Sequence, residues 1–448
     1  MNKLVAKIMG LVLVLSVAFM GTTFADENQV AALQGEVSDL NKKLSALENQ
    51  MKAVQSAPVA ATSEPSTRRY VSTSEQGGGL IHTAQDINMS GYIDVQYNNN
   101  LSNHTTNLNG NPLRSLDPHQ NTFTVNQTVL NFNKIANPEG GAGFNAEILM
   151  GEDAQAIEAV TTGSGSTAIG TAASRFSLLQ AYIQYVAPLK AFENSEILGD
   201  TIDIKAGRMV TLAGAEVIRA TDNWNISRGL LFGLAVPFTH TGVRAEYKVL
   251  NDKVTTYFGL NNGWDNVIDN NTWKTWETGL AFSPVDRVNY MSSIYFGPEA
   301  ARQTGHKRFL WSNVLGWDAT DRLAFKSEWT LGTQRRVNTS QAGATISTEN
   351  TQWWGLAGYA RYKLTDRLGS SYRLEYFRDN QKFRTNPTFA GATGEAALWE
   401  QTFGLDYELA QDLLGRLEYR FDKGNSENPF NGDSSQSTIG AQMIYKFA

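Results

Sequence analysis

The sequence predicts an all-β transmembrane barrel of about sixteen antiparallel strands, preceded by an N-terminal α-helical coiled coil. Three observations support this prediction. Apolar and polar residues alternate with period two after residue 86, a short turn motif recurs between the alternating segments, and apolar residues before residue 56 recur in steps of three and four. Period two is typical of a strand with one apolar face, whereas steps of three and four are typical of a coiled coil. The expected parts are a signal peptide (1–25), a coiled coil (26–55), a flexible linker (56–85) and a barrel (86–448).

The first 25 residues have the features of a secretory signal peptide. Lys3 and Lys7 supply positive charge, residues 8–20 form an uninterrupted apolar core, and residues 23–25 form the cleavage site. A membrane anchor is the alternative, but this core is shorter than the ~20 apolar residues that a spanning helix needs. The mature chain is therefore expected to begin at Asp26.

Composition narrows the class of protein. After the signal peptide no stretch resembles a transmembrane helix, so the mature chain is expected either to be soluble or to span a membrane as a barrel. A charged fraction of 18%, an aromatic fraction of 10% and 39 glycines favour a barrel with a watery lumen. The chain contains no cysteine, which excludes disulfides and thiolate metal sites. Its net charge of −6 argues against a nucleic-acid partner.

The segment after the cleavage site repeats its apolar residues through four heptads. Because they occupy strict a and d positions, self-association is favoured over a single amphipathic helix docked on a globular domain. Valine at a with leucine at d favours two chains, whereas a trimeric barrel would impose three; a homotrimer is the favoured assembly. The predicted oligomerisation residues are Val30, Leu33, Val37, Leu40, Leu44, Leu47, Met51 and Val54.

Period-two alternation starts near residue 86, where Ile93 and Val95 alternate with Asp94 and Gln96. Similar segments recur to the end of the chain, and we count sixteen of them as strands. The expected strands lie near 86–98, 121–134, 143–151, 175–187, 201–210, 238–250, 253–262, 274–283, 288–297, 307–318, 322–332, 351–364, 367–378, 397–410, 413–422 and 435–447.

A turn that contains aspartate recurs between these strands. Aspartate suits a tight turn because its carboxylate can accept the backbone N–H two residues on. Each interval between turns accommodates two spanning strands, one short turn and one longer loop, as in outer-membrane barrels. A β-propeller would need four shorter strands in each repeat, so the barrel is favoured. The turns are Asn251-Asp252-Lys253-Val254, Val285-Asp286-Arg287-Val288, Thr320-Asp321-Arg322-Leu323, Thr365-Asp366-Arg367-Leu368 and the looser Gln411-Asp412-Leu413-Leu414.

An even number of strands places both ends of the barrel segment at the side of the short turns. In a bacterium with two membranes that side is the periplasm, where the coiled coil is therefore expected. The last strand should present its apolar residues to lipid, with the aromatic ones at the membrane interface. The residues expected to face lipid are Ile439, Ala441, Met443, Tyr445 and Phe447.

Several stretches carry a family resemblance. They read NTFTVNQTVLNFNKIANPEGGAGFNAEILMGEDA from Asn121, KAGRMVTLAGAEVIRATDNWNISRGLLFG from Lys205, PFTHTGVRAEY from Pro237 and NNGWDN from Asn261. Together they resemble the outer-membrane β-barrel porin family of the OmpL-like type, over roughly residues 86 to 448. The resemblance implies a porin-like barrel in the outer membrane. The layout of a rod before a barrel is also similar to that of the sucrose porins, which carry a periplasmic coiled coil on a trimeric channel.

A barrel of this size encloses an aqueous lumen, and the inward positions carry charges of both signs. This balance predicts weak ion selectivity, although the same residues could simply pair across neighbouring strands. The lumen-wall candidates are Asp94, Glu147, Lys205, Arg244, Glu246, Lys326, Glu328, Arg361, Arg373, Glu375, Arg416 and Glu418.

Residues 211–237 are too long for a turn and mix charged residues with a tryptophan. Folded into the lumen they would narrow the pore; left outside, they would form a surface loop or a latch onto a neighbouring subunit. The pore-constriction candidates are Arg208, Glu216, Arg219, Asp222, Trp224 and Arg228. A second loop, residues 152–174, is a weaker candidate for the constriction, and its low-complexity middle is expected to be mobile surface.

These features predict a porin that passes small hydrophilic solutes or ions by passive diffusion and oligomerises through a periplasmic coiled coil. The alternative is a structural tether or scaffold whose coiled coil binds peptidoglycan or a periplasmic partner. An enzyme is not expected, because no histidine has metal-ligand spacing and no nucleophile elbow or phosphate loop occurs. The expected partners are outer-membrane lipid and further copies of the chain, without cofactor, metal or catalytic residues.

Overall fold

The computed structural model describes residues 87–102, 110–161, 174–190, 195, 197–300, 303–335, 340–341, 344–345, 350–385, 395–425, 429–430 and 432–447. The chain divides into two compact units, residues 1–79 and 80–448, and only the second contains described residues. The predicted signal peptide, coiled coil and linker lie outside the described residues, as do the eight oligomerisation residues from Val30 to Val54. They therefore stay predictions.

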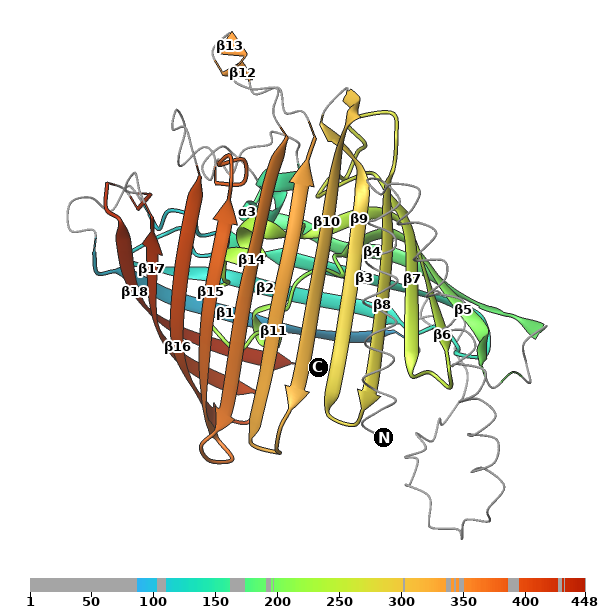
Figure 1. The fold of residues 1–448 in the computed structure, drawn as a ribbon. Coiled ribbons are helices and arrows are strands. Elements are labelled where there is room, and N and C mark those ends of the chain that lie inside the picture. Colours follow the sequence, from blue (N-terminus) through green and yellow to red (C-terminus); the bar gives the residue numbers. More distant parts are fainter. Residues whose placement is uncertain are drawn as a thin grey trace, which may run out of the picture. The chain divides into compact units, whose positions relative to one another are not determined.

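Sixteen antiparallel strands form a closed barrel, in which β1 pairs with β18 (Figure 1). This confirms the predicted barrel, and the strands lie close to their predicted positions. They are β1 (Asn88–Asn100), β2 (Thr122–Lys134), β3 (Gly141–Met150), β4 (Phe176–Pro188), β5 (Leu198–Val210), β6 (Thr239–Val249), β7 (Val254–Asn261), β8 (Thr275–Val285), β9 (Val288–Ala300), β10 (Gln303–Asp318), β11 (Leu323–Gln334), β14 (Thr351–Lys363), β15 (Leu368–Asp379), β16 (Ala396–Ala410), β17 (Leu413–Gly424) and β18 (Ser435–Phe447). A separate two-residue pair, β12 (Ser340–Gln341) with β13 (Ala344–Thr345), lies between β11 and β14 in the chain.

The closing strand follows the predicted alternation. Ile439, Met443 and Tyr445 are exposed, whereas Ile444 between the last two is fully buried. In the barrel these exposed positions form the outer wall, and β18 is held to β1 by a register that pairs Ile93 with Tyr445. An apolar outer face next to a polar inner face is the arrangement that lipid requires of a barrel.

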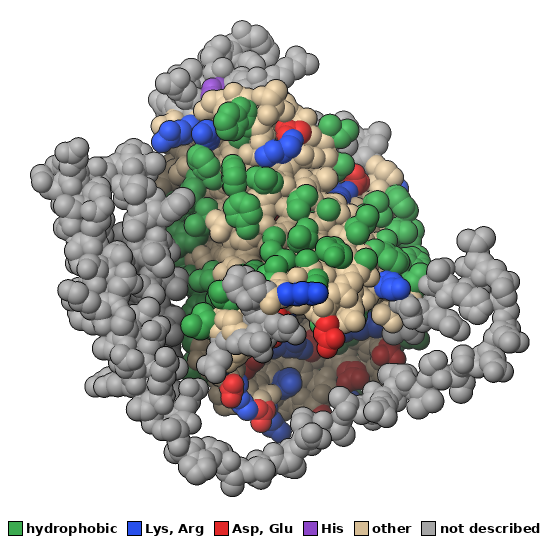
Figure 2. Space-filling view, turned by 90° about the vertical axis from the view of Figure 1, so that its right-hand side faces the viewer, with side chains coloured by type: hydrophobic (Ala, Val, Ile, Leu, Met, Phe, Trp, Pro, Cys, Tyr) green, Lys and Arg blue, Asp and Glu red, His purple; other side chains and the backbone are tan. Residues whose placement is uncertain are grey.

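Aromatic pairs lie on the outer wall near both ends of the strands. Trp317 and Phe325 stack next to the short turn between β10 and β11, with ring centroids 5.7 Å apart. Tyr376 and Trp399 lie 4.6 Å apart beside the long connection between β15 and β16. Figure 2 shows apolar side chains spread over the wall between the two ends. This distribution matches the aromatic girdles that flank the apolar band of an outer-membrane barrel.

The short turns use threonine where the sequence analysis expected aspartate. In two of them the Thr320 and Thr365 hydroxyl oxygens accept the backbone N–H groups two and three residues on, at 3.0–3.3 Å. Asp321 instead points away and pairs with Arg287 of the adjacent turn at 2.6 Å. The expected role of aspartate is therefore wrong for these turns, because the preceding hydroxyl already fills the accepting position. Asp252 and Asp412 contribute differently, by adopting positive φ values of 61° and 64°.

The second loop, residues 152–174, starts with a helix, α3 (Glu152–Thr161). Ala154 and Ile157 on this helix are fully buried in an apolar cluster with Leu149 and Leu179 of the barrel wall. These small and branched side chains pack onto β3 and β4, so the start of the loop is attached to the wall. Residues 162–173, its low-complexity middle, lie outside the described residues.

Among the described residues there is no helix with the length and apolar content needed to cross a membrane.

Candidate functional site

The connection between β5 and β6, residues 211–238, lies within the barrel, and we call it the infolded loop. The Thr211 N–H donates to the Phe238 carbonyl oxygen at 3.0 Å and closes its base. Two short helical turns lie within it, η3 (Ala220–Asp222) and η4 (Leu231–Ala235). Side chains from strands on opposite sides of the barrel bond to this loop. The sequence left its position open; the structure places it inside.

The first half of the infolded loop is bonded to β1, β2 and β3. Gln127 donates to the Ile218 carbonyl oxygen at 2.8 Å and accepts the Ala220 N–H at 3.0 Å. Arg219 donates to the Glu147 carboxylate at 2.6 Å, and this hydrogen bond raises the pKa of Arg219. A barrel strand can meet loop backbone in this way only where its inward side chains are polar.

The middle of the loop is bonded to side chains of β15 and β17. Arg373 donates to Glu216 at 2.6 Å and to the Ser227 carbonyl oxygen at 2.8 Å. Glu418 accepts the backbone N–H groups of Ile226 and Ser227 at 2.6–3.2 Å. Arg373 and Glu418 are buried, so these charge-assisted bonds lie away from water, where each is costly to break.

Side chains of β17, β15 and β11 hold the loop at three further points. Arg416 donates to the carbonyl oxygens of Ala220 and Asn223 at 3.0 and 2.7 Å. Glu375 accepts the Leu230 N–H, and Glu328 accepts the Ala215 N–H at 2.8 Å. Carboxylates meet N–H groups and guanidinium groups meet carbonyl oxygens, so the wall charges satisfy the loop backbone as well as one another.

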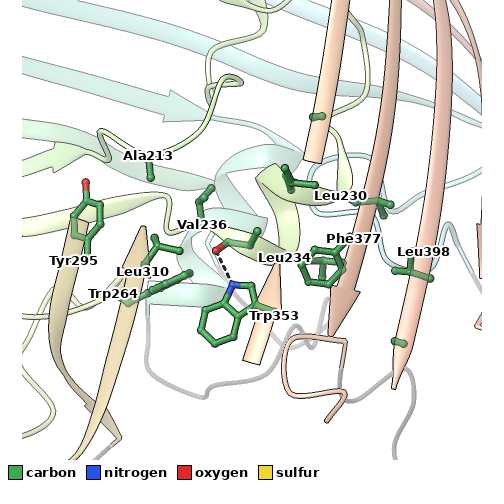
Figure 3. Close-up of a cluster of buried hydrophobic side chains, with 14 of the residues drawn as sticks. Ala213, Leu230, Leu234, Val236, Trp264, Tyr295, Leu310, Trp353, Phe377 and Leu398 are labelled. Atoms are coloured by element: carbon green, nitrogen blue, oxygen red, sulfur yellow. Dashed lines mark hydrogen bonds between the residues drawn. The ribbon is translucent and has the colours of Figure 1, made fainter. Parts of the chain in front are cut away.

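The end of the loop is apolar and packs into a cluster near the long connections. Leu230, Leu234 and Val236 of the loop lie against Trp353, Phe377 and Leu398 of the wall (Figure 3). The Trp353 indole N–H donates to the Ala235 carbonyl oxygen at 3.0 Å, drawn as a dashed line in the figure. Since Trp353, Phe377 and Leu398 are all fully buried, this part of the lumen is filled with side chains.

The six predicted constriction residues fall into two groups. Arg208, Glu216 and Arg228 are buried: Arg208 pairs with Glu158 of α3 at 3.0 Å, and Arg228 donates to carbonyl oxygens of its own loop at 2.6–3.0 Å. Glu216 and Arg228 hold the infolded loop in place, whereas Arg208 holds α3. Arg219, Asp222 and Trp224 keep exposed side-chain surface, and we call them the open edge of the loop.

Of the predicted lumen-wall residues, seven contact the infolded loop: Glu147, Glu328, Arg373, Glu375, Arg416 and Glu418 by hydrogen bonds, and Lys326 through the Trp224 ring, 4.5 Å from its Nζ. The other five pair along the wall. Arg244 binds Glu277, Lys205 binds Glu246 at 3.2 Å and Arg361 binds Asp406 at 3.0 Å, while Asp94 accepts from the amides of Gln96 and Gln442. The alternative that inward residues simply pair across neighbouring strands thus holds for part of the wall.

Residues 86–447 match the family model described as "Putative beta-barrel porin-2, OmpL-like". The chain belongs to this porin family. The infolded loop therefore sits in a porin-like barrel of the outer membrane. No curated protein matches the sequence.

Solved structures similar to the porin are outer-membrane barrels too. The outer membrane channel DcaP of Acinetobacter baumannii has 13% identity and a TM-score of 0.52, over 81% of this chain and 97% of that chain. An anion-selective porin from Comamonas acidovorans has 8% identity and a TM-score of 0.51, over 81% and 99%. The trimer form of in-vitro folded OmpT from Vibrio cholerae has 10% identity and a TM-score of 0.50, over 81% and 99%. These similarities show a shared fold.

Two buried carboxyl groups in the porin's loops lie next to the infolded loop. Asp153 on α3 accepts from Asn126 at 3.3 Å and from Gln127 at 2.5 Å, the same glutamine that binds the infolded loop. Burial raises the pKa of Asp153 to about 8. Asp265 accepts the backbone N–H groups of Phe238 and Thr239 at 2.7 and 2.8 Å, and burial raises its pKa to about 6. Both carboxyl groups therefore change charge close to neutral pH.

Sequence reasoning missed the uncharged groups that hold the loop, above all Gln127 and Trp353. A signal for Gln127 was present, since it is a polar residue at an inward position of a predicted strand. Apart from Trp224, all the predicted lumen and constriction residues are charged. In the described part of the porin, no group of three or more His, Asp or Glu side chains is arranged to hold a metal ion.

Proposed function

We propose that the chain forms a water-filled channel in the bacterial outer membrane, through which small hydrophilic solutes or ions diffuse passively. The infolded loop is the constriction, with Arg219, Asp222 and Trp224 at its open edge. The observation that carries this proposal is the attachment of the loop to opposite walls of a sixteen-stranded barrel, to β3 through Glu147 and to β11 through Glu328. A loop fixed in this way reduces the open cross-section without moving when a solute passes.

Charge and shape at the short-turn end support the same proposal. Lys205, Glu246, Arg361 and Asp222 keep exposed side-chain surface inside the barrel. Figure 2 shows this lower end hollowed, with basic and acidic side chains along the hollow. Polar walls favour water and hydrophilic solutes over apolar ones.

The direct test is single-channel conductance of the refolded chain from residue 26 onwards in a planar lipid bilayer. We expect stepwise openings and a reversal potential in a salt gradient that depends on the charges named above. Barrel folding is checked beforehand by heat-modifiable migration in gel electrophoresis. A folded barrel that inserts into the bilayer but passes no current would refute the channel.

The oligomeric state is part of the proposal. We propose a homotrimer organised by a periplasmic coiled coil of residues 26–55. A neighbour in the fold comparison, OmpT, was solved in a trimer form, which supports this choice. Deleting residues 26–55 should convert trimers to smaller species in analytical ultracentrifugation while the conductance of each barrel persists. If the deletion leaves trimers intact and weakens pull-down of peptidoglycan, the coiled coil is a tether instead.

A further inference from the structure

A pocket of about 450 Å³ lies at the short-turn end of β10, β11 and β14. Four basic residues line it, Arg287, Arg322, Arg361 and Lys363, together with two acidic ones, Asp318 and Asp321. We call it the basic pocket.

The basic pocket opens on the inner side of the barrel. Along β11, residues at even positions face inward, as the bond from Glu328 to the infolded loop shows; Arg322 continues this row. Along β14, odd positions face inward, as the bond from Trp353 to the same loop shows, and Lys363 continues that row. Arg361 reaches across β15 to Asp406 on β16, which is possible only on the concave face.

Charges in the pocket are not balanced. Asp321 is mostly exposed and is engaged by Arg287 at 2.6 Å. Asp406 engages one nitrogen of Arg361, whose Nε is buried without a hydrogen-bond partner. Within the described ranges, Arg322 and Lys363 have no carboxylate at ion-pair distance. Asp318, the other acid of the lining, forms no ion pair with a described residue, so the four basic residues exceed Asp318, Asp321 and Asp406 by one positive charge. The pocket therefore offers more donors than these acids use.

The positive charge continues towards the constriction. Lys326 lies four residues after Arg322, in the same inward row of β11. Its ammonium group lies over the Trp224 ring of the infolded loop. It too lacks an ion-pair partner among the described side chains. On the opposite wall, Lys205 is held between Asp203 at 3.5 Å and Glu246 at 3.2 Å. One wall thus carries unpaired cations, whereas the other neutralises its own.

We infer that the basic pocket and Lys326 bind small anions that carry carboxylate or phosphate groups, and that they bias the channel towards such solutes at its short-turn end. The inference rests on the proposed channel. Guanidinium groups suit planar or tetrahedral oxyanions because they donate two parallel hydrogen bonds, and an ammonium group adds a compact charge. Since the basic residues at the rim are exposed to water, the binding should be weak and reversible, as passage through a channel requires.

The test compares two double variants of the full chain with equal loss of charge. Arg322→Gln with Lys363→Gln removes the unpaired cations of the pocket, whereas Lys248→Gln with Lys253→Gln removes two exposed cations at the same end on the β6–β7 side. Inorganic phosphate is the probe, added to one side of a planar bilayer at a time. In the pocket variant the phosphate concentration that halves the current should rise about fivefold, because two exposed charged contacts to the anion are lost. The control variant should change less than about twofold.

Phosphate binding is also measured by calorimetry on the detergent-purified porin, which needs no current. Weaker binding by the pocket variant than by the control is the expected result. Equal binding by the two variants, or no phosphate binding by the unmodified porin, would overturn the inference even if the channel conducts. A silent bilayer with intact, pocket-dependent phosphate binding would instead refute the proposed channel and leave the anion site standing.

Discussion

The two halves of the barrel interior differ in how far their side chains are exposed to water. Near the long connections, Trp353, Phe377 and Leu398 are fully buried around the end of the infolded loop. Near the short turns, Lys205 and Arg361 keep 21% and 32% of their side-chain surface exposed. The first half is packed like the core of a soluble protein, and the second is lined like an open channel. The end of the infolded loop is therefore packed in the first half, whereas the charged side chains of the second half remain in contact with water.

This difference has an energetic consequence. A buried ion pair is costly to break, because the remaining partner stays charged in a poorly solvated place. An exposed pair is worth little, because water and salt replace it. Substitutions of the same chemical type should therefore affect folding in the packed half and permeation in the open half. The following variants test that division.

The largest effect is expected from Arg373→Ala. The guanidinium group is fully buried and binds Glu216, Glu400 and the Ser227 backbone. Its removal leaves the buried Glu216 carboxylate without its cation and Glu400 with Arg420 alone, at 3.5 Å, which should lower the free energy of unfolding by about 3–5 kcal/mol. Guanidinium chloride unfolding in detergent, followed by tryptophan fluorescence, measures the change.

Arg378→Ala is the matched control on the same strand. Arg378 pairs with Glu395, but both side chains are about two-fifths exposed. Its removal should lower the free energy of unfolding by less than about 1 kcal/mol. Equal losses in the two variants would mean that the packed half is no drier than the rim.

The next effect tests the packing around Trp353. A Cβ atom on Gly332 would lie 2.0 Å from the Trp353 ring, which is fully buried and held by its bond to Ala235. Gly332→Ala should therefore lower the free energy of unfolding by about 1–3 kcal/mol. Gly358→Ala is the control, since a Cβ atom there meets nothing within 4 Å. A Gly332→Ala variant as stable as this control would show that the ring is free to move.

The fold could be predicted further than the site, for a physical reason. The alternation that places Ile439 and Met443 outside and Ile444 inside is a local property of the chain, so the strand positions followed from the sequence. The contact between Gln127 and Ala220 joins residues 93 positions apart, and no local pattern encodes it. Arg228 illustrates the same limit. Its charge suggested a role in the constriction, yet its guanidinium group donates to carbonyl oxygens of its own loop.

The helix α3 was not predicted, for a related reason. Its sequence continues into a Gly, Ser and Thr-rich run that is typical of loops. Only the surface provided by Leu149 and Leu179 makes a buried helix favourable there. Burial against another element is not visible in the composition of the segment itself.

A further effect, which depends on pH, is expected at Asp153. Its pKa is raised from 3.8 to about 8, so the folded state binds this proton more tightly than the unfolded state. The contribution to stability is full below about pH 4 and is lost as the pH rises to about 8. Asp153→Asn should remove this part of the pH dependence. The guanidinium chloride midpoint, measured from pH 5 to pH 9 for both proteins, gives the difference; parallel curves would contradict the assignment.

The smallest effect is expected at the open edge of the infolded loop. Asp222 is exposed and pairs with no cation among the described residues; its only side-chain bond comes from the neighbouring Thr221. Asp222→Asn should leave the free energy of unfolding unchanged, because water replaces whatever the carboxylate contributed. It should nevertheless raise the ratio of chloride to potassium permeability, by less than about twofold, since one negative charge leaves the passage. Asp286→Asn removes the same charge from the turn between β8 and β9 and should change neither quantity. If Asp222→Asn alters stability but not the reversal potential, the loop edge belongs to the packed half, and the division between the two halves must be drawn closer to the short turns.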